Sequence, residues 1–480
     1  MDYNQIKTPG VYIDEIPHLP PSIASVPTAI PAFIGYTEIA PSLIEPGAVV
    51  KKPTKISSIF EYQQYYGSGF EETDISITIA FDSTQPVNPA ITTTKTSKKP
   101  TYLMYYALQM FYANGGGECY IVSVGDYSAN GIISENDLKN GLQEIEKIRD
   151  VTLISFPDAV NMDATSYYNL HSLAIAQCVK LQDRFTVMDV WIDDTPPQPG
   201  NPPPDNVQTL RSAALYQDLD DLKYAAVYYP RIYAQVGYVY DEANTSLKIT
   251  NEPNGKNYDG KLNGAKGSAS SYYYLAVNQL QQSFYVLMPA STSILGIYAR
   301  VDDSRGVWKA PANEEIINAV QPEISITNTL QDGLNVDADA GKSVNVIRSF
   351  PGRGPAIVWG ARTLSGNSNE WRYISVRRFF IMAEQSIKNA TEQFVFEPND
   401  QHTWLRIRSM IEIYLTQQWK AGALMGSSTK EAFFVHVGLG QTMTEDDIWN
   451  GRLIVQIGLA VVRPAEFIIL QFMHKMLSES

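Results

Sequence analysis

The stretch VTLISFPDAVNMDATSYYNLHSLAIAQCVKLQDRFTVMDV, residues 151–190, decides the fold class. It opens with the apolar run 151–155, passes through a helix-forming segment at 166–182 and ends in a second apolar run at 184–190. Short apolar strands separated by helices of this length are typical of a parallel or mostly parallel sheet with crossover helices. The stretch therefore predicts an α/β fold.

The same alternation extends in both directions from this stretch. Ser134 and Asp137 are placed to form a capping box at the start of one further helix. The other predicted elements are strands at 31–38, 118–124, 223–230 and 357–363, a helix from 101 to the glycines at 115–117, and helices at 135–149 and 210–219. A single α/β domain accounts for this part of the chain.

Three segments interrupt the pattern. Residues 40–100 are rich in Ser, Thr and Pro and predict irregular structure, and residues 192–206 form a proline-rich loop. Residues 234–284 contain the Gly-, Asn-, Ser- and Lys-rich run NEPNGKNYDGKLNGAKGSAS, which predicts a surface insertion.

The C-terminal part has a different rhythm. Long helices are predicted at 375–392 and 400–421, followed by a strand at 432–437, a capped helix at Thr444, and strands at 452–462 and 465–472. The domain prediction is an N-terminal arm at 1–31, a strand with an irregular segment at 32–100, an α/β domain at 101–365 carrying the insertion 234–284, and an α+β domain at 366–480 that ends in a terminal strand.

The arm contains PGVYIDEI, residues 9–16, which predicts a short strand after a Pro-Gly turn. Five prolines follow between Pro17 and Pro31, so the chain cannot return directly as a hairpin partner. A proline stalk of about 15 residues at roughly 3.1 Å each spans on the order of 45 Å. This length is sufficient for the strand to reach past the edge of its own domain.

Composition excludes several classes of function. The 480-residue chain has a formal net charge of −14, which argues against nucleic acid as the main partner. No apolar run approaches the roughly 20 residues of a membrane-spanning helix, and we expect no signal peptide or direct membrane insertion. The two cysteines, Cys119 and Cys178, fit synthesis in a reducing cytosol.

Candidate chemical motifs fail on spacing. The GKS at 341–343 lacks the earlier glycine of a phosphate-binding loop, and GRGPAIVWG at 352–360 lacks the third glycine of a dinucleotide-binding turn. The five histidines form no metal-ligand pair, and no G-x-S-x-G elbow is present. We therefore predict no catalytic, metal or cofactor-binding residues, and no cofactor.

Long phrases distributed over nearly the whole chain resemble the contractile tail sheath family. The phrases are PGVYIDEIPHLPPSIASVPTAIPAFIGYTE (9–38), YYPRI (228–232), ILGIYARVDDSRGVWKAPAN (294–313), PGRGPAIVWGARTL (351–364), EWRYISVRRFF (370–380), FEPNDQHTWLRIRSMIEIYLTQQWKAGALMG (396–426) and NGRLIVQIGLAVVRPAEFIILQF (450–472). The arm and terminal phrases look most like sheaths of phage-tail-like injection particles. The insertion 234–284 departs from the family pattern.

The resemblance implies a structural protein, not an enzyme: a sheath subunit that polymerises into a helical tube around an inner tube and contracts to drive that tube through a target envelope. It implies a subtilisin-like topology for the α/β domain, without protease activity, and a C-terminal domain that faces the inner tube. The implied partners are further copies in stacked hexameric rings, the inner tube protein, and baseplate and terminal cap proteins. Assembly in the bacterial cytoplasm, within a particle that is then released, is the implied location.

Terminal arms that complete a shared sheet between subunits are also implied. The candidate inter-subunit strand residues are Val11, Tyr12, Ile13, Asp14, Phe467, Ile468, Ile469 and Phe472. The candidate contact with the inner tube is the helix carrying Arg406, Arg408 and Lys420. Intramolecular packing of the terminal strand, and ordinary ion pairs within the helix, are the respective alternatives. A hydrolase on the α/β domain and the sheath of a true phage virion are the alternative functions.

Overall fold

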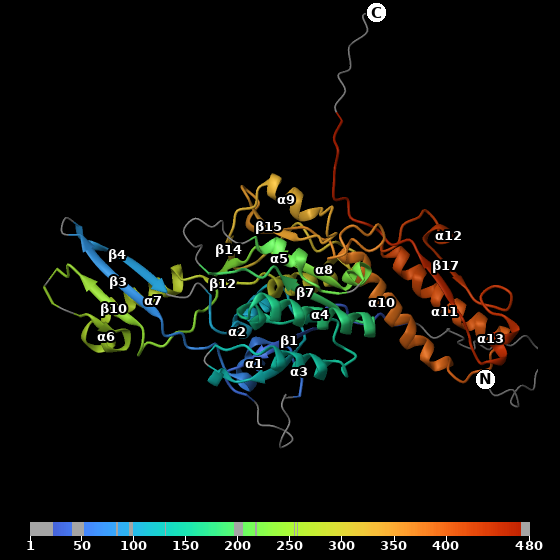
Figure 1. Ribbon diagram of the computed structural model, residues 1–480, viewed down its shortest axis with the longest axis horizontal. Helices are drawn as coiled ribbons and strands as arrows, with labels where there is room; N and C mark the ends of the chain where they lie inside the picture. Colours follow the sequence, from blue (N-terminus) through green and yellow to red (C-terminus); the bar gives the residue numbers. More distant parts are fainter. Residues whose placement is uncertain are drawn as a thin grey trace, which may run out of the picture. The chain divides into compact units, whose positions relative to one another are not determined.

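The computed structural model describes residues 23–40, 52–82, 85–95, 99–129, 131–195, 205–216, 218–253, 255–256 and 258–471 (Figure 1). The described chain divides into two compact units. The larger unit holds residues 27–381 and the C-terminal segment from Arg463, and the smaller holds residues 382–462 and the segment up to Val26. The division falls inside helix α10 (Ile374–Thr391), later than residue 366.

A nine-stranded sheet forms the centre of the larger unit, in the order β13-β16-β15-β8-β7-β6-β1-β5-β2. The strands from β15 to β5 in this order run parallel, whereas β2, β16 and β13 are antiparallel to their neighbours. The bounds are β1 Pro31–Tyr36, β2 Thr54–Ile56, β5 Cys119–Gly125, β6 Leu153–Ser155, β7 Phe185–Asp189, β8 Ala225–Tyr229, β13 Glu314–Glu315, β15 Asn345–Phe350 and β16 Gly354–Trp359. The mixed α/β fold predicted from residues 151–190 is confirmed.

Helices cover both faces of this sheet. Alternate residues of β1 point to opposite sides: the Phe33 ring meets Phe111 of α2, whereas Ile34 approaches Gly141 of α3. Helix α4 packs with α3, and α8 packs with α2. The bounds are α2 Met104–Ala113, α3 Glu135–Ile145, α4 Ala164–Leu181 and α8 Ser291–Arg305.

Two buried carboxyl groups fasten helices to the sheet. Asp158 accepts the backbone N–H groups of Leu103 and Met104 at the start of α2, and Asp189 accepts those of Ala290 and Ser291 at the start of α8. Burial raises the pKa of each carboxyl to about 6, although these N–H groups act in the opposite direction. Both acids therefore serve as helix caps inside the core.

The helix predicted at 210–219 is wrong. The chain forms α5 (Asn206–Ser212) and a 3-10 turn at Leu219–Tyr224 instead. Asp205 accepts the N–H groups of Val207 and Gln208, and Asp218 accepts that of Asp220. Each aspartate starts a separate short helix, so capping decides the boundaries here.

The prediction of irregular structure at 40–100 is also wrong for much of that segment, and the insertion predicted at 234–284 contains regular structure. Together they form a subdomain with a four-stranded sheet in the order β11-β10-β3-β4. Its elements are β3 Ile75–Asp82, β4 Gln85–Lys95, β10 Ser246–Thr250, β11 Gly260–Lys261, α6 Leu262–Ser268 and α7 Ser270–Ser283, while α1 Ile59–Tyr66 lies upstream. Because β3 and β10 pair across about 170 intervening residues, neither segment shows its partner in the local sequence.

This subdomain has a hydrophobic core separate from that of the nine-stranded sheet. Ile77 and Ile79 from β3 meet Leu247 from β10 and Leu262 from α6.

We expect Leu262→Ala to destabilise the subdomain by about 2–5 kcal/mol through the cavity it leaves. Amide hydrogen exchange should accelerate in β3 and β10 but remain unchanged in β1 and β6. Uniform acceleration in both sheets would contradict two separate cores.

The smaller unit is built from long helices and a short sheet. Helix α11 (Gln401–Lys420) begins at Asp400, whose side chain accepts the Thr403 N–H. Strands β17 (Phe433–His436) and β18 (Gln456–Leu459) pair antiparallel, with α12 (Thr429–Ala432) and α13 (Glu445–Trp449) in their connections. The predicted long helices and the strand at 432–437 are confirmed.

The described end of the N-terminal arm packs against its own chain. The Val26 N–H donates to Ser386 Oγ at 3.0 Å, and the Thr28 hydroxyl donates to Asp302 at 2.5 Å. Ile30 then bonds Thr152 beside β6. The arm is thus anchored on its own subunit immediately before β1.

Candidate assembly site

The C-terminal segment is attached to the larger unit by a buried ion pair. Arg362 donates to Glu466 from Nη2 at 2.7 Å and from Nε at 3.0 Å, and its side chain is 5% exposed. Asn335 Nδ2 at 2.8 Å and the Tyr373 hydroxyl at 3.3 Å donate to the same carboxylate. We call these four residues, Asn335, Arg362, Tyr373 and Glu466, the tail clamp.

The electrostatics of the clamp favour an ionised Glu466. Burial alone would raise the pKa of this carboxyl, but hydrogen bonds from Arg362 and Asn335 and the guanidinium charge outweigh it. The pKa of Glu466 therefore lies below its ordinary value of 4.5. A charged, multiply bonded carboxylate holds the chain firmly at this position.

Directly after the clamp, apolar side chains are exposed to solvent. Phe467, Ile468 and Ile469 are 71%, 79% and 82% exposed, and Leu470 is exposed as well. The described residues 463–471 pair with no strand, and Figure 1 draws them as a trace without helix or strand. The strand predicted at 465–472 is therefore unpaired within this chain where it is described, and Phe472 lies outside the described residues.

A second incomplete feature lies in the smaller unit. Within the described residues, its sheet consists of β17 and β18 alone, extended by bonds between 423–425 and 460–462. Two-stranded sheets are marginal in water, and each outer edge presents unpaired N–H and C=O groups. Such an edge is able to accept an added strand.

Comparison with known proteins shows which proteins this chain is similar to. Residues 367–474 match the family model of the phage tail sheath C-terminal domain. A tail sheath protein of Vibrio phage KVP40 is 28% identical over 132 residues, which cover 27% of this chain and 19% of that protein. The C-terminal part of the chain is thus similar to tail sheath proteins.

Solved structures extend the similarity to nearly the whole chain. The sheath complex of an extracellular contractile injection system, PVC, in its contracted state is 29% identical, with a TM-score of 0.63 over 98% of both chains. The helical sheath of the anti-feeding prophage in its contracted state is 28% identical, with a TM-score of 0.63 over 98% of this chain and 100% of that one. The anti-feeding prophage baseplate in its contracted state is 25% identical, with a TM-score of 0.67.

The structure places the remaining predicted site residues as follows. Val11, Tyr12, Ile13 and Asp14 lie outside the described residues. On α11, Arg408 pairs with Glu412 at 2.8 Å, and Arg406 approaches Glu397 at 3.8 Å. Lys420 is exposed at the end of the helix. Both arginines thus have acidic neighbours within their own unit, which favours the alternative of ordinary surface pairs.

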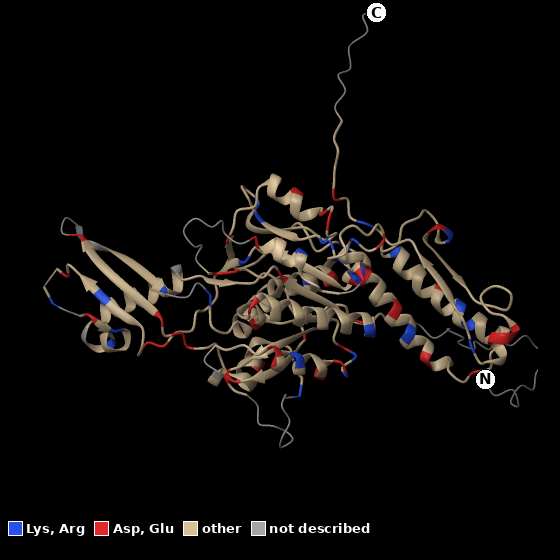
Figure 2. Cartoon of the chain, viewed as in Figure 1, with Lys and Arg blue, Asp and Glu red and all other residues tan. Residues whose placement is uncertain are grey.

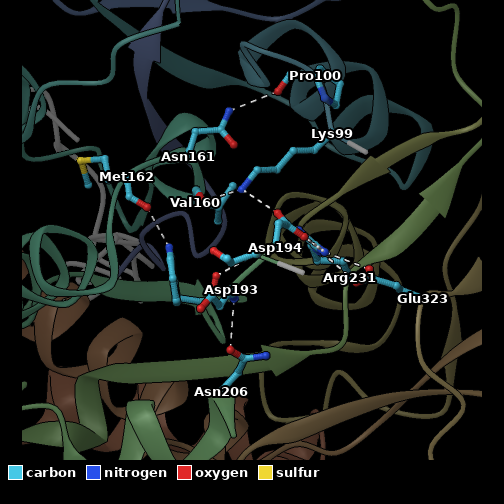
Figure 3. A network of polar contacts seen from close by, with 12 residues as sticks. Lys99, Pro100, Val160, Asn161, Met162, Asp193, Asp194, Asn206, Arg231 and Glu323 are labelled. Carbon is cyan, nitrogen blue, oxygen red and sulfur yellow. Dashed lines mark hydrogen bonds and ion pairs between the residues drawn. The ribbon is translucent and has the colours of Figure 1, made fainter. Parts of the chain in front are cut away.

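A polar network lies at the carboxyl end of the parallel strands (Figure 3). Arg231 pairs with Asp194 at 2.6 Å and with Glu323 at 2.8 Å, and Lys99 reaches Asp194 at 3.1 Å. Burial alone would raise the pKa of Asp194, but Arg231 and Lys99 lower it to about 2. Ligands bind at this edge in many α/β enzymes. Here the edge carries two cations and two anions that satisfy one another, as in a structural brace.

The candidate chemical motifs have structural roles in this chain. Lys342 of the GKS is buried, and its ammonium group donates to the carbonyls of Leu210, Arg211 and Ala213 at the end of α5. Gly352, with φ of 76°, lies in the turn between β15 and β16. Burial lowers the pKa of His171 to about 3, so this imidazole is a poor base.

Among the described residues, no cluster of His, Cys, Asp and Glu side chains is suited to a metal ion. No described helix combines the length and apolarity that a bilayer crossing requires.

Sequence reasoning missed the tail clamp. Glu466 is the one acidic residue within the run AEFIIL, a signal that this position has a specific partner. The partner, Arg362, is about 100 residues away in the chain. Nothing local connects the two residues, so only the fold reveals the pair.

Proposed function

We propose that this chain is the subunit of a contractile sheath of a phage-tail-like injection particle. The near full-length similarity to contracted sheaths of injection systems supports this function. Copies polymerise as stacked, hexameric rings around an inner tube, between a baseplate and a terminal cap. The particle assembles in the bacterial cytoplasm and is then released, and the larger unit has a subtilisin-like topology that carries no protease chemistry.

The exposed tail after the clamp is the proposed link between subunits. Residues 467–470 are apolar and lack a strand partner, so they suit addition to the sheet edge of a neighbouring copy. The β17–β18 sheet offers such an edge, and the arm strand carrying Val11, Tyr12 and Ile13 provides a second donor. Each net hydrogen bond contributes about 0.5–1.5 kcal/mol. Repeated head to tail, such contacts produce an open helical array.

Contraction then proceeds by movement of folded units while the strands keep the array connected. We propose that the energy for contraction is stored during assembly. The two glycine motifs considered as nucleotide-binding loops form turns in the described chain, so they do not point to a nucleotide as the energy source. The smaller unit faces the inner tube, and the subdomain formed by β3, β4 and β10 with α6 and α7 lies on the outer surface. In this arrangement the tail clamp passes force from the added strand into the nine-stranded sheet.

Electron microscopy of the purified full-length protein tests the function. We expect rods or rings of uniform width, because each copy carries both an exposed apolar tail and an open sheet edge. A chain that ends after Glu466 is the matched control. A monomer that remains dispersed at high concentration, and with the tube protein present, would contradict the proposal.

A further inference from the structure

A strained aromatic residue lies at one end of the smaller unit. Phe396 follows helix α10 and the 3-10 turn Glu392–Phe394, and it adopts a φ of +72°. Bulky side chains rarely occupy this left-handed region, which glycine or asparagine adopts more easily. Phe396 is 102% exposed, so no contact with another described residue compensates for the strain. The backbone conformation is unfavourable for phenylalanine, and the apolar ring is exposed to water. Such strain points to a function for this residue.

The loop is held firmly in this conformation. The Glu397 N–H donates to the Phe394 carbonyl at 3.1 Å, and Phe394 itself is buried. Trp404 Nε1 donates to Asn399 Oδ1 at 2.7 Å, and Asn399 Nδ2 donates to the Arg452 carbonyl at 3.1 Å. The loop is therefore fixed on both sides of Phe396, and the ring is presented to solvent by a rigid support.

A second exposed aromatic residue belongs to the same end of the unit. Trp449, at the end of α13, is 85% exposed, and the hydrogen bond between Asn399 and Arg452 joins its connection to the loop of Phe396. Figure 1 shows α13 beside the start of α11, which follows that loop. We call Val395, Phe396 and Trp449 the aromatic tip.

The rim of the aromatic tip is acidic. Figure 2 shows the carboxylates gathered on α13. The rim carboxylates are Glu397, Asp400, Glu445, Asp446 and Asp447, and they outnumber the cations Arg406 and Arg452. An anionic lipid surface would be repelled by this rim, whereas an apolar pocket edged by lysine or arginine complements it.

We propose that Phe396, supported by Trp449, is an anchor that inserts into an apolar pocket of another protein chain, and that lysine or arginine side chains edge this pocket. The strained backbone keeps the ring presented before binding, so little ordering is lost when the partner arrives. The inference rests on the proposed function only in placing that partner within the same particle.

The test places the photo-reactive residue p-benzoylphenylalanine at position 396 of the full-length chain. Purified particles are irradiated, and the crosslinked peptides are sequenced. Ile132, exposed in the larger unit, is the matched control position. We expect a crosslink from position 396, absent from 132, to a segment of another chain with apolar residues flanked by lysine or arginine. No crosslink above the control, or one to lipid or to an acidic segment, would overturn the proposal.

Substitutions separate an anchoring role from a structural one. Glycine accepts the φ of +72°, so Phe396→Gly should leave the melting temperature unchanged or raised, while incorporation into particles falls about thirtyfold. Phe396→Tyr keeps the ring and should restore incorporation. A lowered melting temperature with normal incorporation would show that Phe396 only supports its own unit. If the wild-type chain occurs in no particle at all, the proposed function fails, and not this inference alone.

Discussion

A chain that ends after Glu466 is expected to fold like the full-length protein and to lose polymerisation. The side chains removed first, Phe467 to Ile469, are at least 71% exposed and contribute little to the core. Their loss leaves the neighbouring sheet edge without its added strand. A few net hydrogen bonds, together about 3 kcal/mol, correspond to a loss of polymer affinity of roughly a hundredfold. Circular dichroism measures folding, and sedimentation with electron microscopy measures polymer.

Single substitutions provide the control for this truncation. Proline at 468 or at 469 removes one backbone donor, and the substitution whose N–H points into the ladder should be the more damaging. Ile468→Ala retains the donor and should assemble better than Ile468→Pro. Normal sheaths from the truncated chain would exclude this segment as the link between subunits.

The second large effect is expected at the tail clamp. Glu466→Ala leaves the guanidinium of Arg362, whose side chain is 5% exposed, without its carboxylate. Unpaired buried charges are costly, and we expect a loss of about 3 kcal/mol in local stability. Amide exchange across 361–374, which is closed by bonds such as that from Thr363 to the Arg372 carbonyl, should report this loss. Sheaths should still form, but they should stay extended when triggered, because the strand no longer pulls on a fixed point.

The exposed pair Arg408–Glu412 provides the control for the clamp. Both side chains are more than a third exposed, so Glu412→Ala should have an effect below about 1 kcal/mol. Equal losses of stability in Glu466→Ala and Glu412→Ala would show that the clamp contributes no more than an ordinary surface ion pair.

The clamp also predicts a pH dependence. The folded-state pKa of Glu466 is lowered, so its contribution to stability is present above the ordinary value of 4.5 and is lost as the pH falls through the lowered pKa. Glu466→Gln should remove this part of the acid sensitivity, which thermal unfolding between about pH 5 and pH 2 measures. An unchanged acid profile in the Gln variant would show that the carboxylate is not held in its charged form.

The local sequence determined those helices and strands whose hydrophobic pattern and length are complete within one segment. Residues 151–190 encode β6, α4 and β7 because apolar strands and a helix of sufficient length follow one another without interruption. The long helices α10 and α11 were predictable for the same reason, and the failed glycine spacings correctly indicated turns. The apolar run after Glu466 was recognisable as a strand that needs a partner, although the sequence could not say whether that partner lay within the chain.

Tertiary structure decided the features that depend on distant residues. Strands β3 and β10 pair across about 170 residues, so the segment predicted to be irregular and the predicted insertion form one folded subdomain. Arg362 and Glu466 meet only in the folded chain, and the loop that carries Phe396 is bonded to Trp404 and Arg452 through Asn399. Hydrogen bonds and ion pairs between segments far apart in sequence cannot be predicted from hydrophobic periodicity, because each segment carries only one partner of the interaction.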